Sequence, residues 1–352
     1  MSSVLLTQPT ILRHVDKLEG TPCDIDQPMD WMRAVLLGLG SLTVAASVIP
    51  FWRTTRWWVR ICDFPRFQIA LLALMLLVAT PILRPPAGPL DWIFLGSLVG
   101  VVVWQSTWVG PYLPGFPRAV KKFHGSEFGN RIALLTTNVL QTNRGADRLL
   151  EIIREADPDL VLTVEVDEWW TERLTDGLTA RYPHNICYPL SNTYGLALFS
   201  RLELVEPEVR FIFDEAIPSI RTDVRLRSGA VVGVYGVHPR PPSVLQDTTG
   251  RDIELVRLAL EIKARGTPAI VLGDLNDVAW SPTTSIFMES GDLLDPRRGR
   301  GFYNTYPARW PGLRYPLDYV FNTRHFKICS MRVLPAFGSD HLPLIAELSL
   351  DE

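Results

Sequence analysis

Three long apolar stretches lie in the first third of the chain, at residues 34–52, 67–83 and 92–116, and none of them contains a charged residue. A helix needs about 20 apolar residues to cross a hydrocarbon core of about 30 Å. The pattern therefore predicts three transmembrane helices, at about 34–52, 67–83 and 92–112. Because the middle stretch has only 17 residues, a pair of buried helices or a re-entrant hairpin is the alternative.

From about residue 131 the pattern changes to short β-type runs broken by Gly, Pro, Asn and Asp, such as RIALLTTNV, DLVLTVEV, AVVGVYGVH and AIVLGDLN. Amphipathic helical patterns alternate with these runs at 145–156 and 249–266, and Gly266 ends the second. This alternation predicts a layered α/β domain. We therefore divide the chain into an N-terminal tail (1–30), a transmembrane region (31–117), a linker (118–130) and a globular domain (131–352).

Composition agrees with a membrane protein, since 47 % hydrophobic residues and a mean hydropathy of +0.11 are high for a soluble enzyme. Basic residues fill the first loop and follow the third stretch: Arg53, Arg56, Arg60, Arg66, Arg118, Lys121 and Lys122. By the positive-inside rule we expect a multi-pass protein of the inner (plasma) membrane with a cytoplasmic globular domain, whereas a tail retained inside would reverse this orientation. Of the four cysteines, only Cys187 and Cys329 could pair within the globular domain.

One short stretch, VLGDLNDVAW at 271–280, places several polar residues directly after an apolar run that is typical of a buried strand. Such a run is typical of a strand whose carboxylates emerge at its C-terminal edge. Other polar residues flank apolar runs in the same way, and the full set is Asn138, Glu165, His238, Asp274, Asn276, Asp318, Asp340 and His341. Each residue alone is typical of a turn or a cap. Together they predict one edge at which a cation or a reaction offsets the repulsion between the acids.

Seven motifs follow one another in an order that resembles the endonuclease/exonuclease/phosphatase superfamily, the metal-dependent phosphoesterases that include deoxyribonuclease, sphingomyelinases and inositol phosphate phosphatases. They are TTNVL, TVEVDEWW, YGLALFSR, YGVHPRPP, GDLNDVAWS, YPLDYVF and GSDHLPL. The resemblance covers roughly residues 131–350. It implies an α/β (α+β) four-layer sandwich, in which two packed mixed β-sheets are flanked by helices and the site lies at one end. With its apolar stretches, the chain looks like a membrane-anchored, bacterial-type member.

The resemblance also implies a site for a hard divalent cation, Mg²⁺ or Mn²⁺, with oxygen ligands. Glu165 corresponds to the main ligand, Asn138 would help to hold the metal or the phosphate, and Asp340 would be a second carboxylate near the metal. Val164 stands where the family often has Gln, which affects the expected positioning of the substrate but not metal binding. Asp277, which follows the motif, is expected only to cap the next turn.

Catalytic roles are implied by the same resemblance. Asp274 would orient the attacking water or take its proton, and Asn276 would donate a hydrogen bond to the phosphoryl oxygen. Their i, i+2 spacing puts both on one face of an extended segment. His341 resembles the histidine that contacts the phosphate, with Asp318 fixing its tautomer. His238 corresponds to the histidine that many members use as a general acid.

The expected substrate follows from charge and from membrane attachment. From residue 131 onward the chain has 24 Lys and Arg residues against 30 Asp and Glu residues, whereas nucleic-acid-binding proteins usually have a basic surplus. A bilayer anchor favours a lipid-linked phosphoester or diphosphate as the substrate. One alternative is a nuclease of DNA or RNA, in which the arginine-rich loop 295–301 would grip the polyanion instead of being a solvated surface turn. The other is a catalytically silent binding protein with the same fold.

Overall fold

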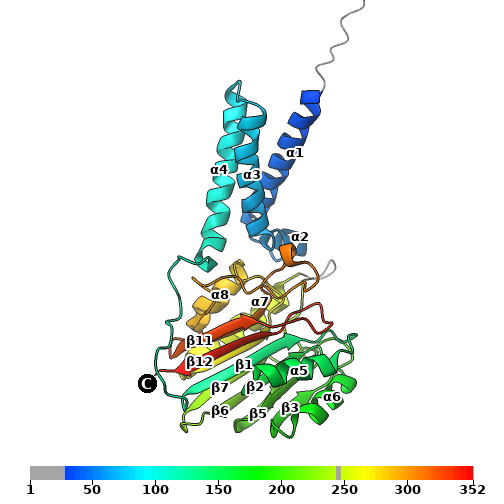
Figure 1. Ribbon diagram of the computed structural model, residues 1–352, viewed down its shortest axis with the longest axis vertical. Helices are drawn as coiled ribbons and strands as arrows, with labels where there is room; N and C mark the ends of the chain where they lie inside the picture. Colours follow the sequence, from blue (N-terminus) through cyan, green and yellow to red (C-terminus); the bar gives the residue numbers. More distant parts are fainter. Residues whose placement is uncertain (1–27, 243–246, 352) are drawn as a thin grey trace, which may run out of the picture.

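The computed structural model describes residues 28–242 and 247–351 of the chain. A bundle of long helices stands on a layered globular domain (Figure 1). The N-terminal tail expected at 1–30 lies outside the described residues up to residue 27. The two parts therefore correspond to the two hydrophobic patterns of the sequence.

The bundle consists of α1 (Pro28–Val48), α3 (Arg66–Leu83) and α4 (Pro89–Val109). All three helices are long and apolar enough to cross a membrane, by length and composition. Large apolar side chains point away from the bundle: Leu42, Ile82 and Val103 are 65 %, 74 % and 60 % exposed. An apolar surface of this kind suits hydrocarbon better than water. Helix α1 starts before residue 34 because a helix can continue beyond the apolar stretch that defines a span.

Two six-stranded sheets form the globular domain. The first has the order β11-β12-β1-β2-β4-β3, with β1 (Arg131–Asn138), β2 (Leu160–Val164), β3 (His184–Tyr188), β4 (Leu196–Ser200), β11 (Phe326–Val333) and β12 (Leu344–Leu350). The second has the order β5-β6-β7-β8-β10-β9, with β5 (Leu204–Arg210), β6 (Ser219–Arg225), β7 (Val231–Val237), β8 (Ala269–Asp274), β9 (Leu293–Leu294) and β10 (Asp318–Thr323). Only β1–β2 and β7–β8 are parallel among these strand pairs, so both sheets are mixed.

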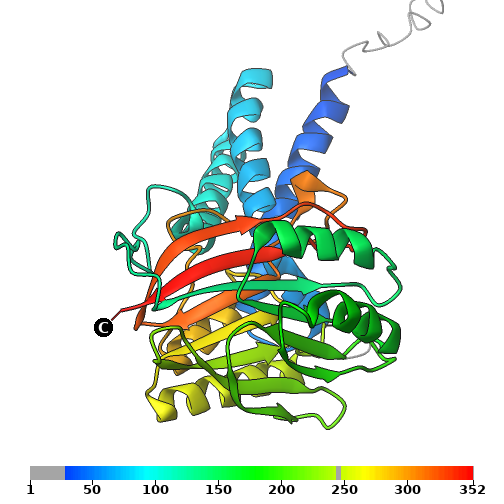
Figure 2. The ribbon, with the colours of Figure 1, turned by 60° about the horizontal axis from the view of Figure 1, so that its bottom comes forward.

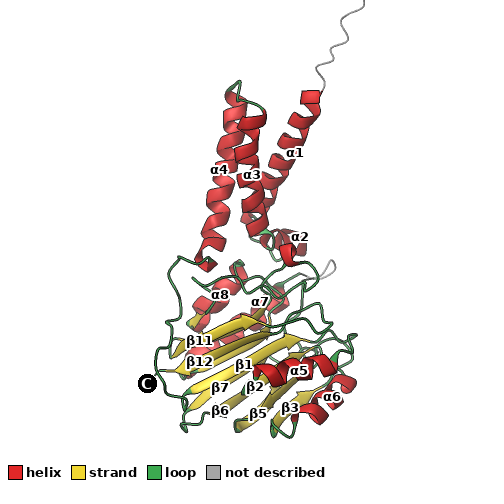
Figure 3. Ribbon diagram, viewed as in Figure 1, coloured by secondary structure: helices red, strands yellow, loops and turns green. Residues whose placement is uncertain are grey.

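The sheets pack face to face, and helices cover their outer faces (Figures 2 and 3). Buried aliphatic residues of both sheets, such as Leu134, Leu162 and Leu272, fill the space between them. Helices α5 (Ala146–Ala156) and α6 (Glu168–Leu178) pack on the first sheet, and α7 (Thr249–Arg265) and α8 (Pro282–Gly291) pack on the second. Burial on both faces explains why the central strands are continuous apolar runs. The predicted four-layer sandwich is confirmed.

Short helical turns occupy the junction between the bundle and the globular domain. These are η1 (Ile49–Phe51), α2 (Trp57–Arg60), η2 (Ile61–Asp63) and η3 (Gly110–Tyr112), whereas η4 (Pro311–Leu313) lies in a later loop. We call residues 53–65, between η1 and α3, the junction segment. It lies between the helices of the bundle and the sandwich (Figure 1), so it can contact both.

The segment expected as a linker, 118–130, packs against the sandwich. Val120 is 1 % exposed within the core between the sheets. The backbone N–H of Phe123 donates to the carbonyl of Ile328 (2.8 Å), and the N–H of Ile328 donates to the carbonyl of Lys121 (2.9 Å). The connection is therefore docked along β11 instead of being a free tether, because it has both an apolar side chain and backbone groups to satisfy.

Cys187 and Cys329 do not form a disulfide, and both are free. They lie on β3 and β11, which are the two opposite edge strands of the first sheet. Burial raises the pKa of each thiol to about 11. Both are therefore unreactive thiols at neutral pH, since the thiolate is the reactive form.

Candidate active site

The eight predicted site residues lie at one edge of the sandwich. Strands β1, β2, β7 and β8 end at this edge, whereas the antiparallel β10 and β12 begin there. The register places Asp318 directly opposite Asp274. A hydrogen bond from Asn138 Nδ2 to Asp274 Oδ2 (3.2 Å) joins the first sheet to the second. Residues far apart in the sequence thus become neighbours because strand ends meet.

The backbone is strained where the strands end. Glu165 and Asn276 have φ of 64° and 52°, in the left-handed region that non-glycine residues seldom adopt. Gly273 has φ of 139°, and a Cβ there would lie 1.9 Å from the carbonyl oxygen of Val237. Only glycine fits this close approach. The glycine of the GDLND motif therefore allows the strand to deliver Asp274 next to β7.

Asp274 is the centre of the site and is fully buried. Its Oδ1 accepts a hydrogen bond from the backbone N–H of Asn276 (2.8 Å). Its Oδ2 lies 3.6 Å from His341 Nε2 and 3.9 Å from His238 Nε2. Burial raises the pKa of Asp274, against the opposing effect of the two histidines. A carboxylate with a raised pKa and no arginine partner is suited to exchanging a proton.

His341 is held by Asp318, as predicted for a tautomer-fixing pair. His341 Nδ1 lies 2.8 Å from Asp318 Oδ2, and both side chains are buried. Burial alone would lower the pKa of His341, but Asp318 and Asp274 outweigh it and raise the pKa to about 10. His341 is therefore a cation at neutral pH. Since it also lines the site cavity, it presents positive charge where a phosphate would bind.

His238 lies behind Asp274 and is 2 % exposed. Burial lowers its pKa, so the ring is neutral at pH 7. Its ring centroid is 5.8 Å from that of Tyr194. Among the described residues, Nδ1 of His238 has no hydrogen-bond partner. Its role as a general acid stays a prediction.

The oxygen donors at the cavity fit a hard divalent cation. Glu165 and Asp340 both line the cavity, and burial raises the pKa of Glu165, with the charge of Asp340 adding to this effect. A bound cation would offset both the burial of the Glu165 carboxylate and its repulsion with Asp340. Asn138 donates from Nδ2 to Glu165 Oε1 (2.8 Å), and its amide oxygen accepts from the backbone N–H of Leu140 (2.9 Å). Asn138 thus orients Glu165 in this geometry.

A second group of potential ligand atoms lies deeper in the site. Atoms of Asp274, Asp318 and His341 lie within 4.8 Å of one another. The hydrogen bond between His341 and Asp318 already uses one ring nitrogen, and the protonated ring neutralises charge between the two carboxylates. Glu165 and Asp340 thus offer carboxylate oxygens at the cavity, whereas the potential ligand atoms of the buried triad face one another.

The cavity at this edge has a volume of about 560 Å³. One wall consists of the predicted residues Asn138, Glu165, Asn276, Asp340 and His341. The rest of the lining, which we call the apolar wall, includes Trp57, Ile61, Phe64 and Pro65 of the junction segment, together with Pro241, Pro242, Tyr306, Tyr315 and Leu317. Sequence reasoning missed this second wall. The available signal was the aromatic and aliphatic content of WWVRICDFP between the first two apolar stretches.

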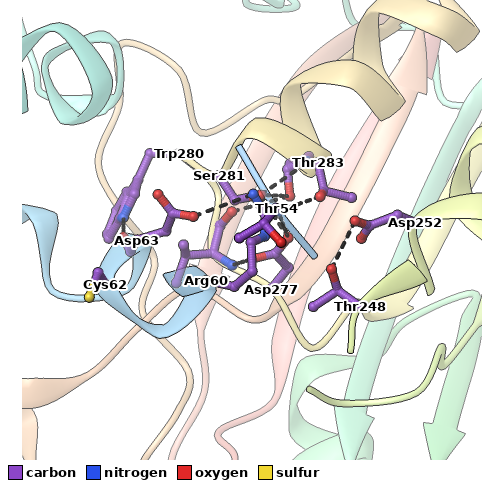
Figure 4. A network of polar contacts seen from close by, with 12 residues as sticks. Thr54, Arg60, Cys62, Asp63, Thr248, Asp252, Asp277, Trp280, Ser281 and Thr283 are labelled. Carbon is purple, nitrogen blue, oxygen red and sulfur yellow. Dashed lines mark hydrogen bonds and ion pairs between the residues drawn. The ribbon is translucent and has the colours of Figure 1, made fainter. Parts of the chain in front are cut away.

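Asp277 does more than cap a turn, which corrects the expectation from the sequence. It is 2 % exposed, and its Oδ2 lies 3.1 Å from Arg251 Nη2 and 3.8 Å from Arg60 Nη2. The same oxygen accepts a hydrogen bond from Ser281 Oγ (2.7 Å; Figure 4). Ser281 itself caps α8. Asp277 therefore stabilises the loop that follows β8.

The arginine-rich loop 295–301 is not a solvated turn. Arg297 is fully buried, pairs with Asp295 (2.8 Å) and stacks 3.9 Å above the ring of Tyr319. Arg300 donates to two backbone carbonyls, those of Pro296 and Val120. These arginines stabilise the loop because each finds an acceptor inside the fold. Arg297 is therefore closed to a nucleic acid, whereas Arg298, which lies over the ring of Tyr112, is partly exposed.

Comparisons with known proteins agree with this geometry. The model of the Endonuclease/Exonuclease/phosphatase family matches residues 135–341. A search of curated proteins found no match. The chain resembles the structure of an endonuclease/exonuclease/phosphatase from Beutenbergia cavernae DSM 12333, with 19 % identity and a TM-score of 0.50 over 63 % of this chain and 72 % of that one.

Two further structures have the same fold. One is D. rerio TDP2 complexed with single strand DNA product (14 % identity, TM-score 0.53, 62 % of this chain and 99 % of that one). The other is a functionally unknown conserved protein from Enterococcus faecalis V583 (15 % identity, TM-score 0.53, 62 % and 100 %). At these identities the likeness shows the fold alone.

Proposed function

Since the chain belongs to the endonuclease/exonuclease/phosphatase family, we propose that it is a membrane-anchored, Mg²⁺-dependent phosphohydrolase that cleaves a phosphoester or diphosphate of a lipid-linked substrate. Members of this family are metal-dependent phosphoesterases, nucleases and phosphatases, so the reaction class follows from membership. The lipid substrate, the identity of the metal and the attachment to a membrane are our proposals.

We propose a lipid substrate because the cavity is lined by both polar and apolar residues. Its acidic and histidine-bearing residues suit a phosphate with its metal, whereas four residues of its apolar wall come from the junction segment between two candidate spans. A water-soluble phosphoester would gain nothing from Trp57, Ile61 and Phe64. A lipid that reaches the site from the bilayer would bury its first apolar carbons against them.

The residues of the site have separable tasks. When bound at Glu165 and Asp340, a divalent cation would supply Lewis-acid polarisation of the phosphoryl group. Asp274 accepts the proton of the attacking water, because burial raises its pKa. His341, fixed by Asp318 at 2.8 Å, places positive charge beside the phosphoryl oxygens.

Asn276 has one amide hydrogen left for the substrate. Its Nδ2 donates to the backbone carbonyl of Pro239 (3.1 Å), and an amide nitrogen carries two hydrogens. Since Asn276 also lines the cavity, the second hydrogen can bind a phosphoryl oxygen. The bond to Pro239 holds this donor in place before the substrate arrives, which lowers the cost of reorganisation.

Nucleic acid is the weaker candidate substrate. The globular domain has an acidic surplus, and its arginine-rich loop is committed to internal contacts. Binding to a phosphate backbone depends on freely available Lys and Arg. The proposed cytoplasmic orientation in the inner membrane is supported by exposed basic residues that lie close in the sequence to the ends of the candidate spans, namely Arg53, Arg56, Arg118, Lys121 and Lys122.

A substrate panel tests the proposed function. The detergent-solubilised full chain is incubated with phospholipids, a polyprenyl diphosphate, and single- and double-stranded nucleic acid, each with Mg²⁺, Mn²⁺ or a chelator, and with Asp274→Asn as the inactive control. We expect metal-dependent turnover confined to the lipid substrates. Turnover confined to nucleic acid would refute the lipid proposal, and metal-independent turnover would refute the assigned metal site. Substrate binding without any turnover would favour a silent binding protein.

A further inference from the structure

The junction segment contacts the loop that carries the catalytic residues. We call residues 274–281 the catalytic loop. Arg60 donates a hydrogen bond to Thr283 Oγ1, and its Nη2 lies 3.8 Å from Asp277 Oδ2 (Figure 4). Trp280 Nε1 donates to the backbone carbonyl of Asp63 at 2.9 Å. The segment between two candidate spans thus touches the catalytic loop at several points.

These contacts are closed to solvent. Asp63, Asp277 and Trp280 are each 2 % exposed, and the side chain of Arg60 is 11 % exposed. Water screens ion pairs weakly in such surroundings, so a buried pair responds strongly to the loss of one partner. The contacts therefore constrain where the loop can lie, unlike exposed ion pairs, which contribute little.

A polar chain continues from the junction segment into the helical bundle. Arg66 of α3 pairs with Asp63 and donates from Nη1 to Gln105 Oε1 of α4 (3.1 Å). Gln105 Nε2 donates in turn to Ser47 Oγ of α1 (2.9 Å). All three candidate spans are thus connected to Asp63, which also pairs with Arg60 (3.5 Å). The relative arrangement of the spans fixes the position of Arg60.

We propose that the junction segment positions the catalytic loop, with Arg60 as the positioning residue that acts through Asp277. Asp277 directly follows Asn276 in the loop. A shift of the Asp277 carboxylate would therefore also move Asn276, the proposed hydrogen-bond donor, and Asp274, the proposed base. Arg251 of α7 holds Asp277 from the other side at 3.1 Å. The loop is therefore clamped between the sandwich and the membrane-proximal segment. This proposal rests on the hydrolytic function of the site, but not on the nature of the substrate.

Substitution of Arg60 should move the loop without unfolding the protein. Asp277 would keep Arg251, and Asp63 would keep Arg66, so neither buried carboxylate loses its last partner. The expected defect is in the rate because misplacement of a catalytic group by about 1 Å can cost roughly 100-fold. Substrate binding would change little, since Arg60 is not among the cavity-lining residues that the structure describes.

The test compares Arg60→Gln, Arg60→Lys and the control Arg53→Gln in the detergent-solubilised full chain. Arg53 lies in the same segment and is exposed. With bis(4-nitrophenyl) phosphate and Mg²⁺ as the probe, we expect Arg60→Gln to lower kcat roughly 10- to 100-fold, with KM within about twofold of wild type. Arg60→Lys should recover part of the rate, because it keeps the charge but not the two-nitrogen fork. Arg53→Gln should match wild type.

Hydrogen exchange provides a readout that does not depend on turnover. We expect peptides covering residues 274–283 to exchange faster in Arg60→Gln than in wild type, at a similar melting temperature, and to be unchanged in Arg53→Gln. A kcat of Arg60→Gln within about twofold of wild type, or unchanged exchange of the loop, would overturn the proposal. If wild type does not cleave the probe, exchange alone decides the positioning role, and the proposed function is judged separately by the substrate panel.

Discussion

Asp274 and Asp277 lie three residues apart and are both buried, yet their surroundings differ. Asp277 has two arginines and a serine hydroxyl around one oxygen, and no histidine shares its contacts within the described residues. Asp274 has two histidines and one asparagine, and no arginine of the described part of the chain pairs with it. Full pairing fixes the charge of a buried acid, whereas incomplete pairing leaves its proton mobile. We therefore expect the catalytic loop to carry one reactive carboxylate, Asp274, and one structural carboxylate, Asp277.

Asp274→Asn tests whether Asp274 is the reactive carboxylate of this pair. We expect kcat to fall by roughly 100- to 10,000-fold, because an amide cannot accept the proton of the attacking water. Stability should be retained, since the substitution removes a carboxylate that burial disfavours. Turnover and thermal unfolding of the same preparation check both expectations. Activity within tenfold of wild type would exclude Asp274 as the base.

Asp277→Asn tests whether Asp277 is the structural carboxylate, which stabilises the fold. Arg60 would keep Asp63 and Arg251 would keep Asp252, but both would lose the carboxylate that they share, and we expect a loss of about 1–3 kcal/mol in the free energy of unfolding. Denaturant unfolding measures this loss. The contrast with Asp274→Asn is the point of the experiment: equal stability of the two variants would contradict the distinction between them.

Glu254 sharpens the comparison as a buried acid without a basic partner. It is 2 % exposed, its Oε1 has no hydrogen-bond partner among the described residues, and burial, with the charge of Asp214, raises its pKa to about 8. The folded state therefore keeps this proton between pH 4.5 and about 8, where the unfolded state has lost it. Its contribution to stability is complete below pH 4.5 and is lost as the pH rises to about 8.

The matched variant is Glu254→Gln, which stays neutral at every pH. We expect the stability of wild type relative to Glu254→Gln to fall with rising pH across this window, with a slope of up to about 1.4 kcal/mol per pH unit. Denaturant midpoints measured at several pH values give the slope. Parallel profiles for the two proteins would show that Glu254 is ionised in the folded state at neutral pH.

Glu165→Gln tests the metal side of the cavity. Wild type should gain thermal stability from added Mg²⁺ or Mn²⁺, because the ions bind only the folded state. The variant should require at least roughly tenfold more metal for the same gain, since a carboxylate ligand is lost. Melting curves over a metal titration provide the comparison. An identical titration of the two proteins would place the ion elsewhere, with the buried triad of Asp274, Asp318 and His341 as the next candidate.

Trp57→Ala is expected to have the smallest effect and tests the apolar wall. We expect the KM for a long-chain lipid phosphoester to rise about tenfold, from the apolar contact area lost. Turnover of bis(4-nitrophenyl) phosphate should not change, because this wall does not contact the phosphate in our assignment. Trp31, which is 63 % exposed and belongs to α1, is a matched control position. An equal effect on both substrates would assign Trp57 a structural role instead.

The sequence predicted the sandwich, and it predicted that the polar residues at the strand ends would meet at one edge, because both depend on local signals. Apolar runs that end in Asn, Glu, His or Asp mark buried strands and their ends, and strand ends meet in a sheet. The hydrogen bonds of Asn138 to Glu165 and to Asp274 are consequences of that pattern.

The sequence did not reveal the second wall of the cavity or the role of Asp277. Arg60 and Asp277 are 217 positions apart, and nothing local to either residue indicates the other. The arginines of the first loop were counted as signals of orientation, whereas Arg60 and Arg66 are engaged in buried ion pairs. Contacts between the helical bundle and the sandwich depend on how two separately folded parts dock, which hydrophobic periodicity does not encode.

The most direct test of the account compares two substrates that share one phosphate head group, a lipid phosphoester in mixed micelles and its water-soluble short-chain analogue. The ratio of kcat/KM between them is measured for the full-length protein with Mg²⁺ and with a chelator. We predict that turnover requires the metal and that the lipid is preferred at least roughly tenfold, in keeping with the buried apolar area. Equal kcat/KM values for the two substrates, or turnover that survives chelation, would contradict the account.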